Sequence, residues 1–177
     1  MKYIILILSI SLIASTGFAR KNNSKDIEKA CFDMASKYID IEANGTIELS
    51  GTNQFGACNV LILSDVYTSG TTKEETGTLR VMLESNPDNE GHLSTETALH
   101  YNHILTKQKL SYCKFMNNTL SYKSSDKHKT GWRSRYNYKT DISLDDQGKI
   151  EKVKLFEKIK RRGRTKYNVT LECNISS

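Results

Sequence analysis

Lysine and arginine are the residue types whose number and spacing in this chain most strongly indicate a binding role. From Lys123 to the C-terminus there are fifteen Lys/Arg and seven Asp/Glu, whereas the segment from Arg20 to Tyr122 has ten and thirteen. The C-terminal segment therefore has a net charge of +8 and the preceding one −3. A basic region of this kind attracts anionic partners, and salt weakens that attraction by screening the charges.

Several of these cations crowd around one predicted turn, and others lie on the polar face of a predicted neighbouring strand. Guanidinium groups make bidentate contacts to phosphate, sulfate or carboxylate. We therefore predict a binding site for an anionic polymer or an envelope surface. Polysaccharide, lipid head groups, glycosaminoglycan and nucleic acid are all compatible with it. The alternative is a solvated hairpin whose lysines discourage edge-to-edge aggregation. The predicted site consists of Arg161, Arg162 and Arg164, supported by Lys158, Lys160, Lys166, Arg133 and Arg135.

Two histidines, His100 and His103, form an H-x-x-H pair. On a helix, residues three apart share a face and could hold one metal ion, whereas on a strand they face opposite sides and could not. The zinc-protease pattern H-E-x-x-H is absent from the sequence, and no two cysteines are close enough for a C-x-x-C site. We therefore expect neither a metal site nor a cofactor.

Motifs for catalysis are also absent from the sequence, which has no G-x-S-x-G elbow and no Gly-rich phosphate loop. The favoured reading is a non-catalytic binding domain. Because the members of a catalytic triad meet only in the fold, a secreted hydrolase remains an alternative. Its pocket would be built from His100, His103 or His128 and nearby carboxylates. A third possibility is a structural or inhibitory domain that acts through an apolar surface.

The N-terminal residues have the pattern of a secretory signal peptide. Lys2 precedes an apolar run from Tyr3 to Ile13, and small residues lead to Ala19. This run is too short to span a bilayer, and the flanking residues fit cleavage after Ala19. We expect residues 1–19 to be removed and residues 20–177 to form a single secreted or periplasmic domain without a transmembrane anchor.

Four cysteines in an exported chain predict two disulfide bonds, because disulfides form and persist in oxidising compartments. Four cysteines allow three pairings. We favour the pairs Cys31 with Cys58 and Cys113 with Cys173, which join neighbours in the sequence.

The hydrophobic pattern predicts the α+β class, with an N-terminal helix packed on a mostly antiparallel sheet that ends in a three-stranded meander. Ser24 is a suitable N-cap for a helix to Ile39, with an apolar stripe at helical spacing. The stripe consists of Ile27, Cys31, Met34, Ala35 and Tyr38.

Beyond this helix the hydrophobic period changes to two, which is typical of half-buried strands. Leu93 to Leu105 fits either a helix or a strand, and we favour a strand. Near the C-terminus Trp132, Tyr136, Tyr138, Ile142 and Leu144 share one parity, and tight turns follow. The other predicted strands are Thr46 to Ser50, Ala57 to Tyr67, Gly77 to Glu84, Lys109 to Phe115, Thr119 to Lys123, and the runs that contain Val153 to Ile159 and Tyr167 to Ile175.

Overall fold

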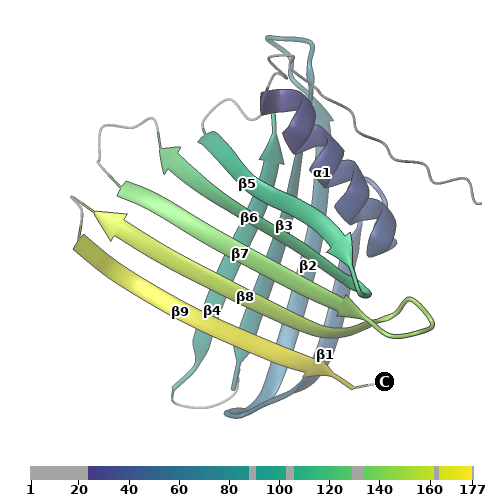
Figure 1. Ribbon diagram of the computed structural model, residues 1–177, viewed down its shortest axis with the longest axis vertical. Helices are drawn as coiled ribbons and strands as arrows, with labels where there is room; N and C mark the ends of the chain where they lie inside the picture. Colours follow the sequence, from purple (N-terminus) through teal and green to yellow (C-terminus); the bar gives the residue numbers. More distant parts are fainter. Residues whose placement is uncertain (1–23, 88–90, 103–105, 129–133, 162–163, 177) are drawn as a thin grey trace, which may run out of the picture.

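The computed structural model describes residues 24–87, 91–102, 106–128, 134–161 and 164–176. These residues form one helix and an antiparallel sheet of nine strands (Figure 1). The chain is therefore mostly antiparallel β-sheet with a single helix, which confirms the predicted class in part. The elements are α1 (Ser24–Tyr38), β1 (Thr46–Asn53), β2 (Gly56–Thr68), β3 (Glu75–Ser85), β4 (Leu93–Tyr101), β5 (Thr106–Met116), β6 (Thr119–His128), β7 (Ser134–Leu144), β8 (Ile150–Arg161) and β9 (Arg164–Ile175).

The sheet folds over on itself to make two layers. Its strand order is β4-β3-β2-β1-β9-β8-β7-β6-β5, so the first and last strands of the chain are neighbours in the middle. In Figure 1, β1 to β4 form the back layer and β5 to β9 run across them as the front layer. The layers join where Gly51 of β1 pairs with Ile175 of β9 and Thr52 pairs with Asn174.

Alternation along the strands places one face of each layer in the core. A hydrogen bond of 2.7 Å between the hydroxyls of Thr97 and Thr140 crosses from β4 to β7 inside this core. Because side chains at positions two apart share a face, the apolar residues of one parity pack between the layers. The buried apolar side chains include Val60, Ile62, Leu79, Val81, Leu83 and Leu99 from the back layer and Leu120, Tyr122, Ile142, Val153, Leu155 and Leu171 from the front layer.

Helix α1 packs on the core at the side where the end strands β4 and β5 approach each other. Its buried face includes Cys31, Phe32 and Ala35. The Phe32 ring contacts Tyr101 edge to face, with 4.9 Å between centroids. Ile27 is 49% exposed. The predicted stripe is therefore rotated toward Phe32, because the Tyr101 ring offers that side chain an aromatic partner.

A glutamine side chain bridges the two end strands of the sheet. Gln108 of β5 donates from Nε2 to the carbonyl oxygen of Ala98 in β4 at 2.7 Å. Its Oε1 accepts from the backbone N–H of His100, also at 2.7 Å. The Gln108 amide thus satisfies β4 backbone groups that a neighbouring strand would otherwise pair with.

Two disulfide bonds are present, but the predicted pairing is wrong. The bonds join Cys31 to Cys113 and Cys58 to Cys173. Cys31 of α1 meets the inward face of β5 instead of β2. The pairing of β1 with β9 brings Cys173 beside Cys58, although 115 positions separate them. Sequence neighbours are therefore not the spatial neighbours here.

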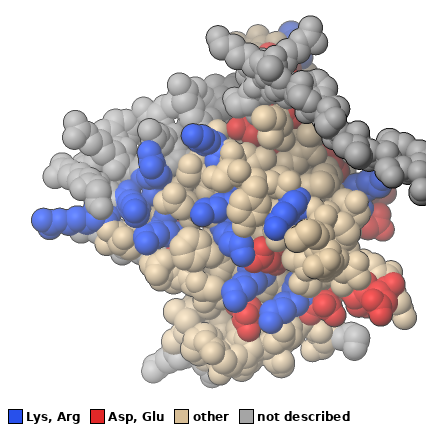
Figure 2. Space-filling view, in the orientation of Figure 1, with Lys and Arg blue, Asp and Glu red and all other residues tan. Residues whose placement is uncertain are grey.

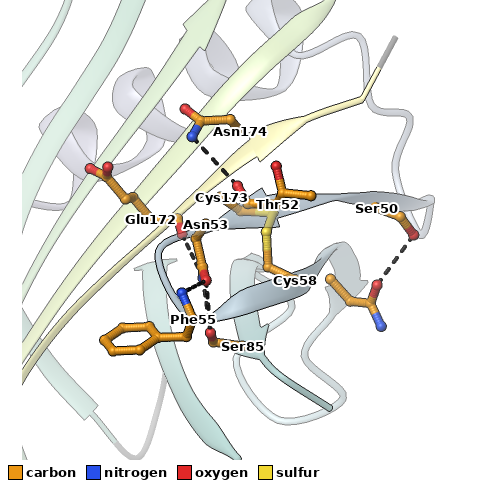
Figure 3. The surroundings of a disulfide bond; sticks show 10 residues. Ser50, Thr52, Asn53, Phe55, Cys58, Ser85, Glu172, Cys173 and Asn174 are labelled. Atoms are coloured by element: carbon orange, nitrogen blue, oxygen red, sulfur yellow. Dashed lines mark hydrogen bonds between the residues drawn. A yellow bond between two sulfur atoms is a disulfide. The ribbon is translucent and has the colours of Figure 1, made fainter. Parts of the chain in front are cut away.

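Figure 3 shows the surroundings of Cys58–Cys173 at the junction of the layers. Asn53 Nδ2 donates to Ser85 Oγ at 2.9 Å and to the carbonyl oxygen of Glu172 at 3.0 Å. Because Ser85 belongs to β3 and Glu172 to β9, this one amide ties the two layers together beside the disulfide.

Most predicted strands are confirmed. The ambiguous segment that begins at Leu93 is a strand, and β7, β8 and β9 form the predicted antiparallel meander. Ile142 and Leu144 are buried, as their parity predicts. The predicted signal peptide and Trp132 lie outside the described residues. Among the described residues, no helix has the length and apolar character needed to cross a bilayer.

Candidate anion-binding face

The outer face of the front layer is rich in lysine and arginine. Tyr122, Ile142 and Leu155 of β6, β7 and β8 are buried between the layers, so residues of the opposite parity point outward. Figure 2 shows the Lys and Arg side chains gathered over this layer. We call this surface the cationic face and define it as Lys109, Lys123, Arg135, Lys139, Lys158 and Lys160.

Strand register places like charges directly opposite each other on the cationic face. Arg135 is the partner of Lys160 between β7 and β8, and both side chains are exposed. Directly opposed like charges destabilise a sheet. Neither residue makes an ion pair with any carboxylate in the described part of the chain. Their repulsion is therefore not offset within the described structure.

In a second like-charge pair, Lys123 opposite Lys139, a nearby carboxylate compensates the repulsion. Lys139 Nζ bonds to a carboxylate oxygen of Asp141, and this hydrogen bond raises the pKa of Lys139. Asp141 is held in turn by the hydroxyl of Ser121, at 2.7 Å. Lys139 thus has an acidic partner, whereas Arg135 and Lys160 have none among the described residues.

Acidic partners occupy the end of the front layer near the junction with β1. Glu172 Oε1 lies 3.5 Å from Lys152 Nζ, and its Oε2 lies 3.4 Å from Lys154 Nζ. Partial desolvation opposes ionisation of Glu172, but the two ammonium groups outweigh it and lower the pKa. Within the described residues, Lys139 is the one member of the cationic face that has an acidic partner, and Arg135, Lys158 and Lys160 have none.

The structure brings three of the predicted site residues together, namely Arg135, Lys158 and Lys160. Arg164 is exposed, but it pairs with Arg161 one position beyond Lys160, so alternation assigns it to the other face. Arg161 and Lys166 belong to β8 and β9, and their side chains are not among those described. Arg133 and Arg162 lie outside the described residues.

Sequence reasoning missed Lys109 and Lys123, and it placed Lys139 on the polar face of the neighbouring strand without including it in the predicted site. Each stands at a polar position of a predicted strand, which is the signal that could have suggested them. What the sequence did not provide is the strand order β8-β7-β6-β5, which places these lysines on the same surface as Lys158 and Lys160.

In the part of the chain that the structure describes, the histidines form no metal cluster. His100 lies on the outer face of β4, where its Nδ1 is 2.9 Å from Thr78 Oγ1. These two residues are register partners, so strand pairing alone accounts for their contact. They line a hollow of about 470 Å³ that also contains Asp65 and Arg80, which form an ion pair with 3.2 Å between Oδ2 and Nη2.

No second histidine lines this hollow in the described part of the structure. His92 lies elsewhere, with Nε2 4.0 Å from Glu84 Oε1. His103 is outside the described residues, and the side chain of His128 is not described. Within the described ranges, no three His, Cys, Asp or Glu side chains are grouped so that they could hold a metal ion.

Comparison of the chain with models of known protein families, with curated proteins and with solved structures gives no match.

Proposed function

We propose that this chain is an exported, non-catalytic α+β domain, secreted or periplasmic, which binds an anionic polymer or envelope surface through the cationic face. The observation that carries the proposal is the exposed pair Arg135 and Lys160, opposed across β7 and β8 without a described acidic partner. An anion bound between them relieves their repulsion and makes charge-assisted hydrogen bonds to both.

The spacing of the cationic face favours a ligand that carries many charges. Neighbouring strands lie about 4.8 Å apart and alternate residues along a strand about 6.8 Å apart. The cations of the face extend across β5 to β8. A small anion reaches two or three of them, whereas a polyanion follows the face and neutralises several at once. Such binding is strong at low ionic strength and weakens steeply with salt.

The test is retention of the oxidised protein on immobilised heparin across a sodium chloride gradient. A variant with Arg135→Gln, Lys158→Gln and Lys160→Gln should elute at clearly lower salt than the parent protein. The matched control removes three exposed lysines that are not part of the face, as Lys37→Gln, Lys73→Gln and Lys149→Gln. Its net charge equals that of the face variant, but because the cationic face is intact its elution should stay close to that of the parent.

Equal losses in the two variants would mean that retention follows total charge, and the cationic face would then have no special role. A variant with Arg161→Ser, Arg162→Ser and Arg164→Ser tests the turn at which the sequence predicts the anion-binding site. A larger loss there than in the face variant would move the site from the sheet surface to the turn.

A further inference from the structure

The outer face of the back layer has the opposite charge. Strand register places Glu48 beside Leu61, Leu61 beside Met82, and Met82 beside Glu96, in one row across β1, β2, β3 and β4. Glu84 lies in the adjoining row. We call these five residues the acidic face. The row thus has a carboxylate at each end and two apolar side chains between them.

The acidic face is also hollowed. A cavity of about 450 Å³ opens on it, and its lining includes Glu48, Leu61, Met82 and Glu84. Leu61 and Met82 are half-buried although they lie on the outside of the sheet. The Glu84 side chain is 43% exposed, and its Oε1 lies 4.0 Å from Nε2 of His92. The hollow therefore combines an apolar floor with carboxylates at its rim.

We infer that the acidic face of one molecule binds the cationic face of a second copy of this chain. The charges are complementary, since the acidic face has three glutamates and the cationic face consists of lysines and one arginine. The cationic face also has an apolar element of its own, because half-buried Phe156 lies directly opposite Lys139. Phe156 is suited to meet Leu61 and Met82 when the faces stack.

The repeat distances of the two faces also match. Both are antiparallel sheets, so both present side chains at the same spacing of about 4.8 Å across strands and 6.8 Å along them. Two such surfaces stack face to face in β-sandwiches, with their side chains interdigitated. The side chains on the cationic face of a second copy are thus spaced to match those of the acidic face.

The geometry makes the contact heterologous, because the two faces belong to different layers of the molecule (Figure 1). A head-to-tail contact of this type leaves one face free at each end and can continue into rings or open chains. Four strands at the standard spacing, each contributing about 20 Å of its length, give a face of roughly 400 Å² per partner, or about 800 Å² in total. This area is below that of stable specific complexes, so the association is weak, reversible and dependent on concentration and salt.

Self-association uses the cationic face but does not depend on the proposed binding of a polyanion. It also requires the acidic face, which polyanion binding does not use. The two proposals can therefore fail separately, and a polyanion should compete with the second copy and disperse the assemblies.

The test is sedimentation velocity of the oxidised full chain at low salt over a range of protein concentrations. The weight-average sedimentation coefficient should rise with concentration and return to the monomer value at about 0.5 M sodium chloride, where the Debye length is only a few ångströms. A variant with Glu48→Gln and Glu84→Gln should remain monomeric and keep the parent's elution from heparin. The matched control, Glu42→Gln with Asp146→Asn, removes two exposed carboxylates elsewhere and should still associate.

Mixing gives a sharper result. The acidic-face variant retains only its cationic face, and the Arg135→Gln, Lys158→Gln, Lys160→Gln variant retains only its acidic face. Each alone should be monomeric, and an equimolar mixture should form one-to-one dimers that do not extend further. A monomeric parent protein at every concentration in low salt, or association that survives the Glu48 and Glu84 substitutions, would overturn the inference. Circular dichroism of each variant shows whether it is folded.

Discussion

A side chain on Gly51 would collide with the backbone of Asn174. A Cβ atom at Gly51 would stand 2.0 Å from the Asn174 carbonyl oxygen, far inside van der Waals contact. Gly51 lies in the short pairing of β1 with β9, where the two layers of the sheet join. The junction therefore depends on an uninterrupted approach of two backbones.

Gly51→Ala should destabilise the protein by about 1–3 kcal/mol, because neither β1 nor β9 can move aside without breaking its pairing. Thermal unfolding followed by circular dichroism measures the effect. Gly70→Ala is the matched control, since a Cβ there meets nothing within 4 Å. Equal melting temperatures for Gly51→Ala and the parent protein would show that the backbones do not approach this closely.

The bridge made by Gln108 should also have a measurable energy. Gln108→Leu keeps the volume of the side chain but removes its bonds to the Ala98 carbonyl and the His100 N–H. We expect a loss of about 1–3 kcal/mol, because these backbone groups lose their partner. Hydrogen exchange at the His100 amide should become faster. Gln54→Leu, in the exposed β1–β2 turn, should leave both readouts unchanged.

The disulfide connectivity can be checked directly. Proteolysis without reduction should release a peptide containing Cys31 linked to one containing Cys113, and likewise for Cys58 and Cys173. A Cys31–Cys58 peptide as the main product would contradict the structure.

Removing either bond should cost roughly 4.5–5 kcal/mol in the chain-entropy model, because both close long loops. The sequence separations of 82 and 115 differ too little to distinguish the bonds by loop length. Denaturant unfolding of the two paired Cys→Ala variants, one for each bond, therefore should give similar losses of stability. A much smaller loss for one bond would mean that it constrains the unfolded chain less than its length implies.

Glu157 should make stability depend on pH in the direction opposite to most carboxylates. Its half-buried side chain faces β4, and desolvation raises its pKa above 4.5 despite a hydrogen bond of 3.1 Å from the Thr95 hydroxyl. The nearby carboxylate of Glu96 adds to this rise. A raised folded-state pKa favours the native state below the unfolded pKa, and that advantage is lost as pH rises through the folded value.

Glu157→Gln should therefore raise the melting temperature at pH 7, and the gain should shrink as the pH falls toward 4.5. Thermal unfolding of both proteins across this range gives the comparison. Glu151→Gln, at an exposed position of the same strand, should have little effect at any pH. A gain that grew on acidification would have the wrong sign for a carboxylate with a raised pKa.

Local features of this fold could be predicted from the sequence, because they depend on local patterns. Alternation of Ile142 and Leu144 with polar residues identified β7 and its buried side, and turn residues such as Asp145 marked its end. Asp145 Oδ1 accepts the backbone N–H groups of Gln147 and Lys149, each at 2.8 Å, as a tight turn requires.

Long-range relationships could not be predicted in the same way. The pairing of β1 with β9 depends on Gly51 and on a junction between residues over a hundred positions apart. The Cys58–Cys173 bond follows from that pairing, whereas the Cys31–Cys113 bond follows from the packing of α1 beside β5. The extent of the cationic face follows from the order of β5 to β8 in the front layer. Only with the order known do Lys109 and Lys123 join Arg135 on one surface.

The crossed connectivity of the disulfides also constrains biosynthesis. In order of synthesis, the first cysteine bonds to the third and the second to the fourth, so the two covalent loops overlap. When a chain emerges from its N-terminus, Cys31 and Cys58 become accessible before either native partner has been made. Oxidation at that stage yields a non-native bond that must later be exchanged through a mixed disulfide. Delayed oxidation, until Cys113 and Cys173 have been made, therefore favours the native pairs, and thiol–disulfide exchange converts an early Cys31–Cys58 bond into them.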